Sequence, residues 1–63
     1  MEEHDELLLR ADTSRLLKVG VRTLERWASA GIGPRPIKVG PRAVRYRRSE
    51  VRDWLDAQTQ GAA

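Results

Sequence analysis

Several residue types that support common functions are missing or scarce in this sequence of 63 residues. There is no cysteine, which excludes a disulfide framework and a thiolate zinc site. The longest purely aliphatic run is Leu7-Leu8-Leu9, far short of the roughly 18 apolar residues of a membrane span. The N-terminus is acidic and has no cationic segment of the kind that opens a secretory signal. We therefore expect a small soluble domain from a reducing compartment, with no membrane partner.

The groups that catalysis needs are equally scarce. His4 is the single histidine, and it lies in an acidic segment, residues 1–6, that we expect to be a loose tail. A chain this short buries only about 60% of the surface that it exposes when unfolded, which leaves no room for a deep substrate cleft. We expect no enzymatic activity, no catalytic residue, no metal site and no cofactor.

The charges that are present are unevenly distributed. Lysine and arginine number 12 against 9 acidic residues, for a net charge of +3. Residues 13–48 hold ten cations against Glu25 alone, a net charge of +9, whereas residues 1–12 carry −4 and residues 49–63 carry −2. A basic field this concentrated indicates a polyanionic partner, and the predominance of arginine suits phosphate and guanine recognition.

Apolar spacing predicts a mainly helical domain over residues 7–59, followed by a flexible end at 60–63. A short helix is expected near 11–18, and a second one begins after Gly20 and ends at Gly31, a typical C-cap position. Because few residues separate the two helices, the pair is predicted to be a helix-turn-helix. Ser49 is expected to cap a third helix.

Between the second and third helices, the pattern predicts a small β-hairpin. Residues 31–36 are rich in glycine and proline and indicate a loop, and Gly40-Pro41-Arg42 separates two alternating runs. We expect one face to carry the apolar residues Ile37, Val39, Val44 and Tyr46, and the outward face to carry Lys38, Arg45 and Arg47. A basic hairpin of this kind can lie along the phosphate backbone or reach the minor groove.

The second helix has two different faces when it is projected at about 100° per residue. One side carries the apolar residues Val21, Leu24, Trp27 and Ala28, and the other carries Arg22, Arg26 and Ser29. The major groove of DNA admits an α-helix, and arginine is the commonest side chain that reads guanine there. The pattern therefore favours a helix that enters the major groove.

The order and spacing of these motifs resemble the excisionase family, which is related to the DNA-binding domain of MerR-type regulators. The resemblance covers roughly residues 7–57 and rests on segments 19–27, 31–34, 37–40, 44–51 and 54–55. It implies a winged helix-turn-helix of three short helices and a two-stranded antiparallel wing. The chain departs from the family at Lys18, where glycine is usual, and at Gly20, where serine is usual.

The candidate DNA contacts combine the helix projection with the positions that the resemblance implies. On the second helix, in the major groove, they are Arg22, Thr23, Arg26 and Ser29. On the wing and the phosphate backbone, they are Lys38, Arg42, Arg45 and Arg47, with Lys18 at the turn between the helices. Trp27 and Trp54 match core positions of the family and are expected to be packing residues.

The resemblance implies a phage recombination directionality factor in the cytoplasm of a bacterial host. Such a protein binds repeats beside an attachment site, bends the DNA and directs an integrase toward excision. A small transcriptional regulator of the same fold is the alternative, although we expect neither the long dimerisation helix nor the effector domain of MerR-type regulators. The charge alone also allows RNA binding, but RNA readers favour exposed aromatics, and all three aromatics here are expected in the core. A pure protein-interaction adaptor is a third alternative, which DNA binding at moderate salt would distinguish.

Self-association is a further expectation. The acidic tail and the acidic third helix (Glu50, Asp53, Asp56) can face a basic flank of the next copy, head to tail along DNA. The equal alternative is that these acids only keep the two ends of the chain away from phosphates.

Overall fold

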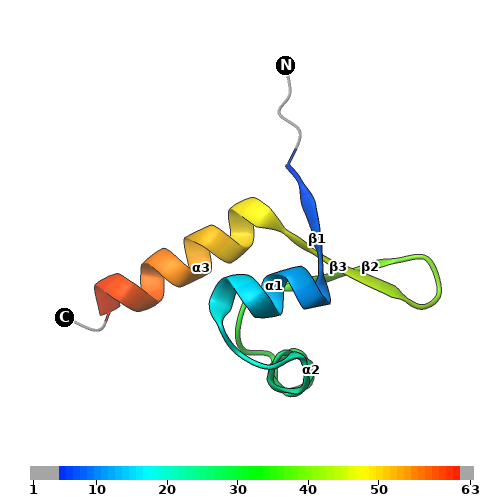
Figure 1. Ribbon diagram of the computed structural model, residues 1–63, viewed down its shortest axis with the longest axis horizontal. Helices are drawn as coiled ribbons and strands as arrows, with labels where there is room; N and C mark the ends of the chain where they lie inside the picture. Colours follow the sequence, from blue (N-terminus) through cyan, green and yellow to red (C-terminus); the bar gives the residue numbers. More distant parts are fainter. Residues whose placement is uncertain (1–4, 62–63) are drawn as a thin grey trace.

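A computed structural model describes residues 5–61 of the chain, with side chains placed through Thr59. The elements in order are β1 (Leu7–Leu9), α1 (Arg10–Leu17), α2 (Val21–Ala30), β2 (Pro36–Val39), β3 (Ala43–Arg47) and α3 (Arg48–Gly61). Helices α1 and α2 lie on one side of the hairpin, which extends in one direction while α3 extends in the other (Figure 1). This architecture confirms the predicted winged helix-turn-helix. No helix within residues 5–61 is long and apolar enough to cross a membrane.

The two helices of the helix-turn-helix begin and end close to their predicted positions. Helix α1 begins and ends one residue earlier than expected. It ends at Leu17 because Lys18 adopts a left-handed conformation (φ 60°). Thr13 is fully buried on α1, and its hydroxyl donates to the Leu9 carbonyl at 3.0 Å. Helix α2 starts after Gly20 and ends at Gly31 (φ 75°), as predicted.

The sheet has one strand more than the two-stranded wing. Strand β1 pairs antiparallel with β3, so the order is β1-β3-β2 and β3 is central. Leu8 pairs with Tyr46, and both side chains are buried in the core with Val51 of α3. Leu17 and Val44 pack against this cluster. The short leucine run therefore attaches the start of the domain to the base of the wing.

The register of the hairpin overturns the predicted division of its two faces. Ile37 pairs with Arg45 and Lys38 pairs with Val44, and paired residues of an antiparallel ladder point to the same face. The inner face, on the side of the helices, consists of Leu8, Pro36, Lys38, Val44 and Tyr46. The outer face consists of Leu7, Leu9, Ile37, Val39, Ala43, Arg45 and Arg47. The expectation that Lys38, Arg45 and Arg47 share one face is therefore wrong.

The cause of this error is the length of the turn. Val39 pairs with Ala43, so the loop contains the three residues Gly40, Pro41 and Arg42. The apolar residues of the two runs would share one face only if the loop contained an even number of residues. Because an odd loop shifts the register by one, it exchanges the faces of one strand relative to the other.

Helix α3 begins before Ser49, and its first turn is held by the N-terminal segment. The Asp5 carboxylate accepts from the Ser49 backbone N–H at 3.1 Å and from the Ser49 hydroxyl at 2.6 Å. The Glu6 carbonyl accepts from Arg48 N at 2.9 Å, and the Glu6 carboxylate pairs with the Arg48 guanidinium at 2.8 Å. Ser49 is thus not the cap as predicted; Asp5 performs this function from outside the helix.

These contacts also correct the predicted chain ends. Asp5 and Glu6 belong to the folded domain, so the prediction of a loose tail is wrong for them, and residues 1–4 lie outside the described range. The hydrogen bonds from Ser49, first the hydroxyl and then the N–H, lower the pKa of Asp5 below its ordinary value, and nearby Arg47 contributes. At the other end α3 continues through Gly61, beyond the predicted boundary at 59.

A second packing contact joins α2 to α3. The rings of Trp27 and Trp54 lie 5.4 Å apart between centroids and are tilted by 46°, an arrangement in the favourable range for aromatic pairs. Both side chains are half-buried, which agrees with their predicted packing role. Gly33 lies directly against Trp27, because a Cβ at this glycine would stand 2.6 Å from Trp27 Cε3.

Candidate nucleic-acid interface

The turn between α1 and α2 is fixed by backbone and side-chain hydrogen bonds. Val19 N donates to the Ser14 carbonyl at 3.1 Å, and the Ser14 hydroxyl donates to the Val19 carbonyl at 2.6 Å. Lys18 N donates to the Arg15 carbonyl at 3.3 Å. Because three hydrogen bonds close the turn, α2 has a defined angle to α1. Lys18 itself is exposed at this turn.

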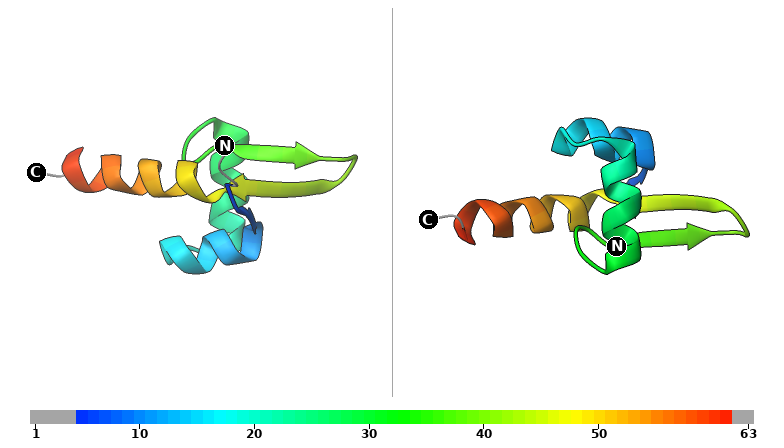
Figure 2. Two further views of the ribbon diagram at one scale, coloured as in Figure 1. Left: turned by 90° about the horizontal axis from the view of Figure 1, so that it is seen from above. Right: turned by 90° about the horizontal axis from the view of Figure 1, so that it is seen from below.

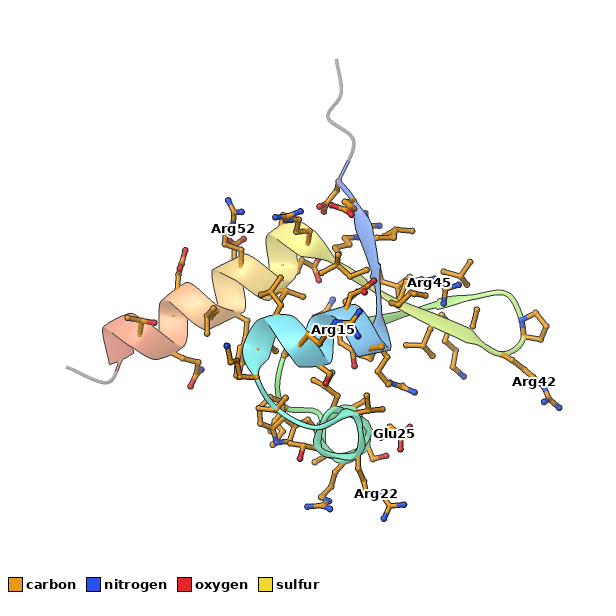
Figure 3. All side chains as sticks on the ribbon, in the orientation of Figure 1. Arg15, Arg22, Glu25, Arg42, Arg45 and Arg52 are labelled. Carbon is orange, nitrogen blue, oxygen red and sulfur yellow. The ribbon has the colours of Figure 1, made fainter. Side chains whose placement is uncertain are left out.

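Helix α2 buries one face and exposes the residues predicted to read DNA. Leu24 is fully buried, whereas Arg22, Arg26 and Ser29 are exposed. Figure 3 shows Arg22 pointing away from α1 into solvent. Thr23 is half-buried at the edge of this surface. The helix therefore presents arginines one turn apart on its free side, which is what a groove-reading helix requires.

Val21 departs from the prediction. It was expected on the packed face of α2 but is 39% exposed at the first position of the helix. Apolar periodicity does not distinguish a buried residue from an exposed one in a first turn, where few neighbours cover the side chain. An exposed aliphatic group beside Arg22 can contact a thymine methyl group in the major groove.

The candidate wing residues are separated into two groups. Lys38 is exposed on the inner face, on the side of α1 and α2, and Arg42 is exposed at the tip of the wing. Arg45 and Arg47 lie on the outer face. In Figure 3, Arg45 lies on the opposite side of the wing from Arg22. The structure thus brings Lys38 and Arg42 to the side of α2, and it does not bring Arg45 and Arg47 there.

The candidate contacts on α2 and the wing are free of internal ion pairs within the described residues. Residues 5–61 contain three ion pairs, none of which involves a candidate contact. They are Arg10 with Glu25 at 3.5 Å, Arg15 with Asp12 at 2.7 Å, and Arg48 with Glu6 at 2.8 Å. Glu25, the single acid of the basic middle segment, lies on α2 and is thus partly neutralised by Arg10. An exposed cation without a partner can replace condensed counterions on a phosphate backbone, so these side chains are available for DNA.

Two structural features that support the site are not predicted by the sequence. The run Leu7-Leu8-Leu9 carries the alternation of a short strand, with Leu8 buried between two exposed leucines, but three residues are too few to predict pairing with β3. The contact between Asp5 and Ser49 joins residues 44 positions apart, and no local pattern signals it.

Comparison with known proteins agrees with this geometry. The family model described as a helix-turn-helix domain matches residues 10–59, which span α1, α2, the wing and nearly all of α3. Comparisons with curated proteins and with solved structures find no significant match. Because this match covers most of the chain, the chain belongs to the helix-turn-helix domain family, a DNA-binding family that includes excisionase-like proteins.

Proposed function

We propose that the chain is an excisionase that binds repeats beside a phage attachment site, bends the DNA and directs an integrase toward excision. The observation that supports this proposal is the exposure of Arg22 and Arg26 on α2, with Lys38 and Arg42 exposed on the wing. The motif order that resembles excisionases supports the particular role. In this role the chain performs no chemistry itself and acts on DNA in the cytoplasm of a bacterial host.

Helix α2 and the wing have different tasks in this proposal. Arg22 and Arg26, with Thr23 and Ser29, read base edges in the major groove, because direct readout requires side chains on a groove-entering helix. Lys18, Lys38 and Arg42 contact phosphates, which position the protein without specifying sequence. Arg45 and Arg47 are left out of the DNA surface because they lie on the outer face.

We expect the DNA to bend because the wing tip and α2, the two proposed contact regions, lie far apart. Arg42 is at the tip of a wing that extends well away from α2 (Figure 3). A curved duplex brings more phosphates within reach of that tip. The cost of a smooth bend over a site is of order 1–6 kcal/mol, which such added contacts can offset.

Self-association on tandem sites is part of the proposal. Glu50, Asp53 and Asp56 of α3 are exposed and form no ion pair within the described residues, so they are free to meet a basic flank of the next copy. Asp5 and Glu6 are already engaged by α3, which leaves α3 as the acidic contributor. Binding isotherms on one site and on several sites test this, since equal affinity per site would contradict cooperative contact.

Footprinting across attachment-site DNA, combined with a circular-permutation bending assay, tests the proposed function as a whole. We expect protection of regularly spaced repeats and altered mobility that depends on the position of the site. An integrase assay on the same DNA should show that excision requires the protein. Protection at a promoter, with no bend and no effect on excision, would favour a transcriptional regulator instead.

A further inference from the structure

The outer face of the sheet has an unusual composition for a surface in water. Its seven residues comprise five aliphatic side chains and two arginines. Within residues 5–61 no acid lies within ion-pair distance of either arginine, although Asp5 lies near Arg47. An antiparallel sheet with one solvated face normally alternates apolar inside and polar outside. Here Leu7, Leu9 and Val39 are 46%, 48% and 43% exposed.

The register arranges this face in rows. Arg45 lies at the centre of one row, between Leu9 on β1 and Ile37 on β2, while Arg47 pairs with Leu7 and Ala43 pairs with Val39. One guanidinium nitrogen of Arg45 donates to the Val44 carbonyl at 2.9 Å, so this side chain folds back onto the strand. The remaining donors stay available between the aliphatic side chains.

No helix within residues 5–61 covers this face. Seen from the side away from α2, the hairpin lies in front of α2, and no helix crosses the hairpin (Figure 2, left). From the opposite side α2 stands in front of the sheet (Figure 2, right). DNA bound by α2 and the inner face would therefore leave the outer face accessible.

We propose that the outer face, Leu7, Leu9, Ile37, Val39, Ala43, Arg45 and Arg47, is a docking surface for an acidic amphipathic helix of a partner protein. The apolar stripe of the partner helix packs on the aliphatic residues of the outer face, and the carboxylates that flank this stripe pair with Arg45 and Arg47. Cores of protein interfaces are apolar and enriched in arginine, whereas a DNA backbone offers phosphates and little for exposed leucine and valine to contact. This inference deepens the proposed recruitment role, because it assigns DNA and the recruited protein to opposite sides of one domain.

A second copy of the chain does not have the required pattern. At about 100° per residue, Leu55 of α3 lies about 100–160° away from Glu50, Asp53 and Asp56, so the acidic side of α3 has no apolar stripe. The partner therefore differs from the α3 of another copy.

Backbone amide chemical shifts test the proposal, since the domain is small enough for complete assignment. The probe is a synthetic helical peptide with a leucine stripe flanked by glutamates, and its control has lysine in place of each glutamate. We expect shifts confined to the outer-face residues with the glutamate peptide, and none with the lysine peptide. The double variant Arg45→Ala/Arg47→Ala should weaken peptide binding about tenfold, and Val39→Ser severalfold.

Matched controls separate the surface from general effects. Arg22→Ala removes an exposed arginine from α2, and Leu55→Ser removes a similarly exposed leucine from α3, so peptide affinity should not change in either variant. Protein saturated with duplex DNA should bind the peptide as well as free protein does. Peptide binding with no DNA binding would refute the proposed function and leave the docking surface intact.

Four results of the peptide titrations would overturn the inference, and a fifth would come from the protein alone. The four are no binding of the glutamate peptide, equal binding of the lysine peptide, shifts centred on α2, and competition between peptide and DNA. Concentration-dependent shifts of the outer-face residues without peptide would overturn it as well, because they would identify a second copy as the occupant.

Discussion

Arg26 is the residue on which sequence recognition can be tested most directly. Its side chain is exposed on the free face of α2, one turn after Arg22, and has no ion-pair partner within the described residues. Arg26→Ala should cost roughly 1–3 kcal/mol in binding and relax the preference for bases at one position of the site. Competition binding with a set of single-base variants measures both effects. A loss that is uniform across these duplexes would mean that Arg26 contacts phosphate.

The backbone of Lys18 is strained, and glycine at this position would relieve the strain. It ends α1 in a left-handed conformation (φ 60°), which L-residues with a Cβ adopt at a cost and glycine adopts freely. Lys18→Gly should stabilise the domain by about 1 kcal/mol, which raises the Tm by about 4–8 °C for a domain of this size. Lys18→Ala is the matched control, because it also removes the charge but retains the Cβ.

The same pair of variants isolates the proposed phosphate contact of Lys18. If the ammonium group contacts a phosphate, both variants should weaken DNA binding equally, although only the glycine variant is more stable. Unchanged binding in both would remove Lys18 from the interface.

Gly33 combines two constraints at one position. Its φ is +77°, and an added Cβ would stand 2.6 Å from Trp27 Cε3, a separation that real Cβ atoms do not tolerate. Gly33→Ala should cost about 1–3 kcal/mol more than Gly31→Ala, since Gly31 has a similar φ of +75° but open space around it. Chemical denaturation measures the difference, and tryptophan fluorescence should change only in the Gly33 variant. Equal costs would show that Trp27 moves aside freely.

At the scale of elements, the start of α3 depends on a segment far away in sequence. The Asp5 carboxylate supplies the acceptor for the first-turn N–H of Ser49 and for its hydroxyl. Because the pKa of Asp5 is lower in the folded protein, ionised Asp5 adds stability above its ordinary pKa. This contribution is lost as the pH falls through the lowered value.

Asp5→Ala should therefore be less stable than the wild type at neutral pH. The difference between the two proteins should shrink below the ordinary pKa of an aspartate. Thermal melts from neutral pH down to acidic pH measure it, with Asp5→Asn as the control that retains the shape without the charge. A difference that does not vary with pH would exclude a role for the carboxylate charge.

Local sequence patterns predicted the helices well and the sheet poorly, for a physical reason. Leu24 and Gly31 signal α2 within a window of ten residues, because a helix is held by contacts between neighbours in sequence. The partner of Arg45 across the sheet depends instead on the number of residues in the turn, which shifts every side chain of a strand to the other face. The pairing of Leu8 with Tyr46 spans most of the chain and depends on tertiary packing. For these reasons the α2 surface could be predicted, whereas the division of the wing could not.

At the scale of the whole molecule, the charges are separated by side as well as along the chain. The +9 middle segment does not form one uniform basic surface, because Arg45 and Arg47 lie on the outer face, opposite Lys38. In the proposed arrangement, fewer cations contact one duplex than the net charge of the segment suggests. The salt dependence of DNA binding reports how many of them do so.

Arg42 and Arg45 provide the sharpest test of this separation, because they belong to the same hairpin and carry the same charge. Arg42 is at the exposed tip, whereas Arg45 is folded back onto the outer face with one nitrogen on the Val44 carbonyl. Each phosphate contact adds about 0.9 to the slope of log affinity against log salt. Arg42→Ala should thus lower the slope by about one for every duplex sequence, and Arg45→Ala should leave it near the wild-type value. Because both variants remove one positive charge, a general loss of attraction would affect them equally, and only an oriented interface predicts the difference. Equal reductions in slope would mean that the duplex wraps around both sides of the wing, which would leave no free outer face for a partner protein on the DNA-bound domain.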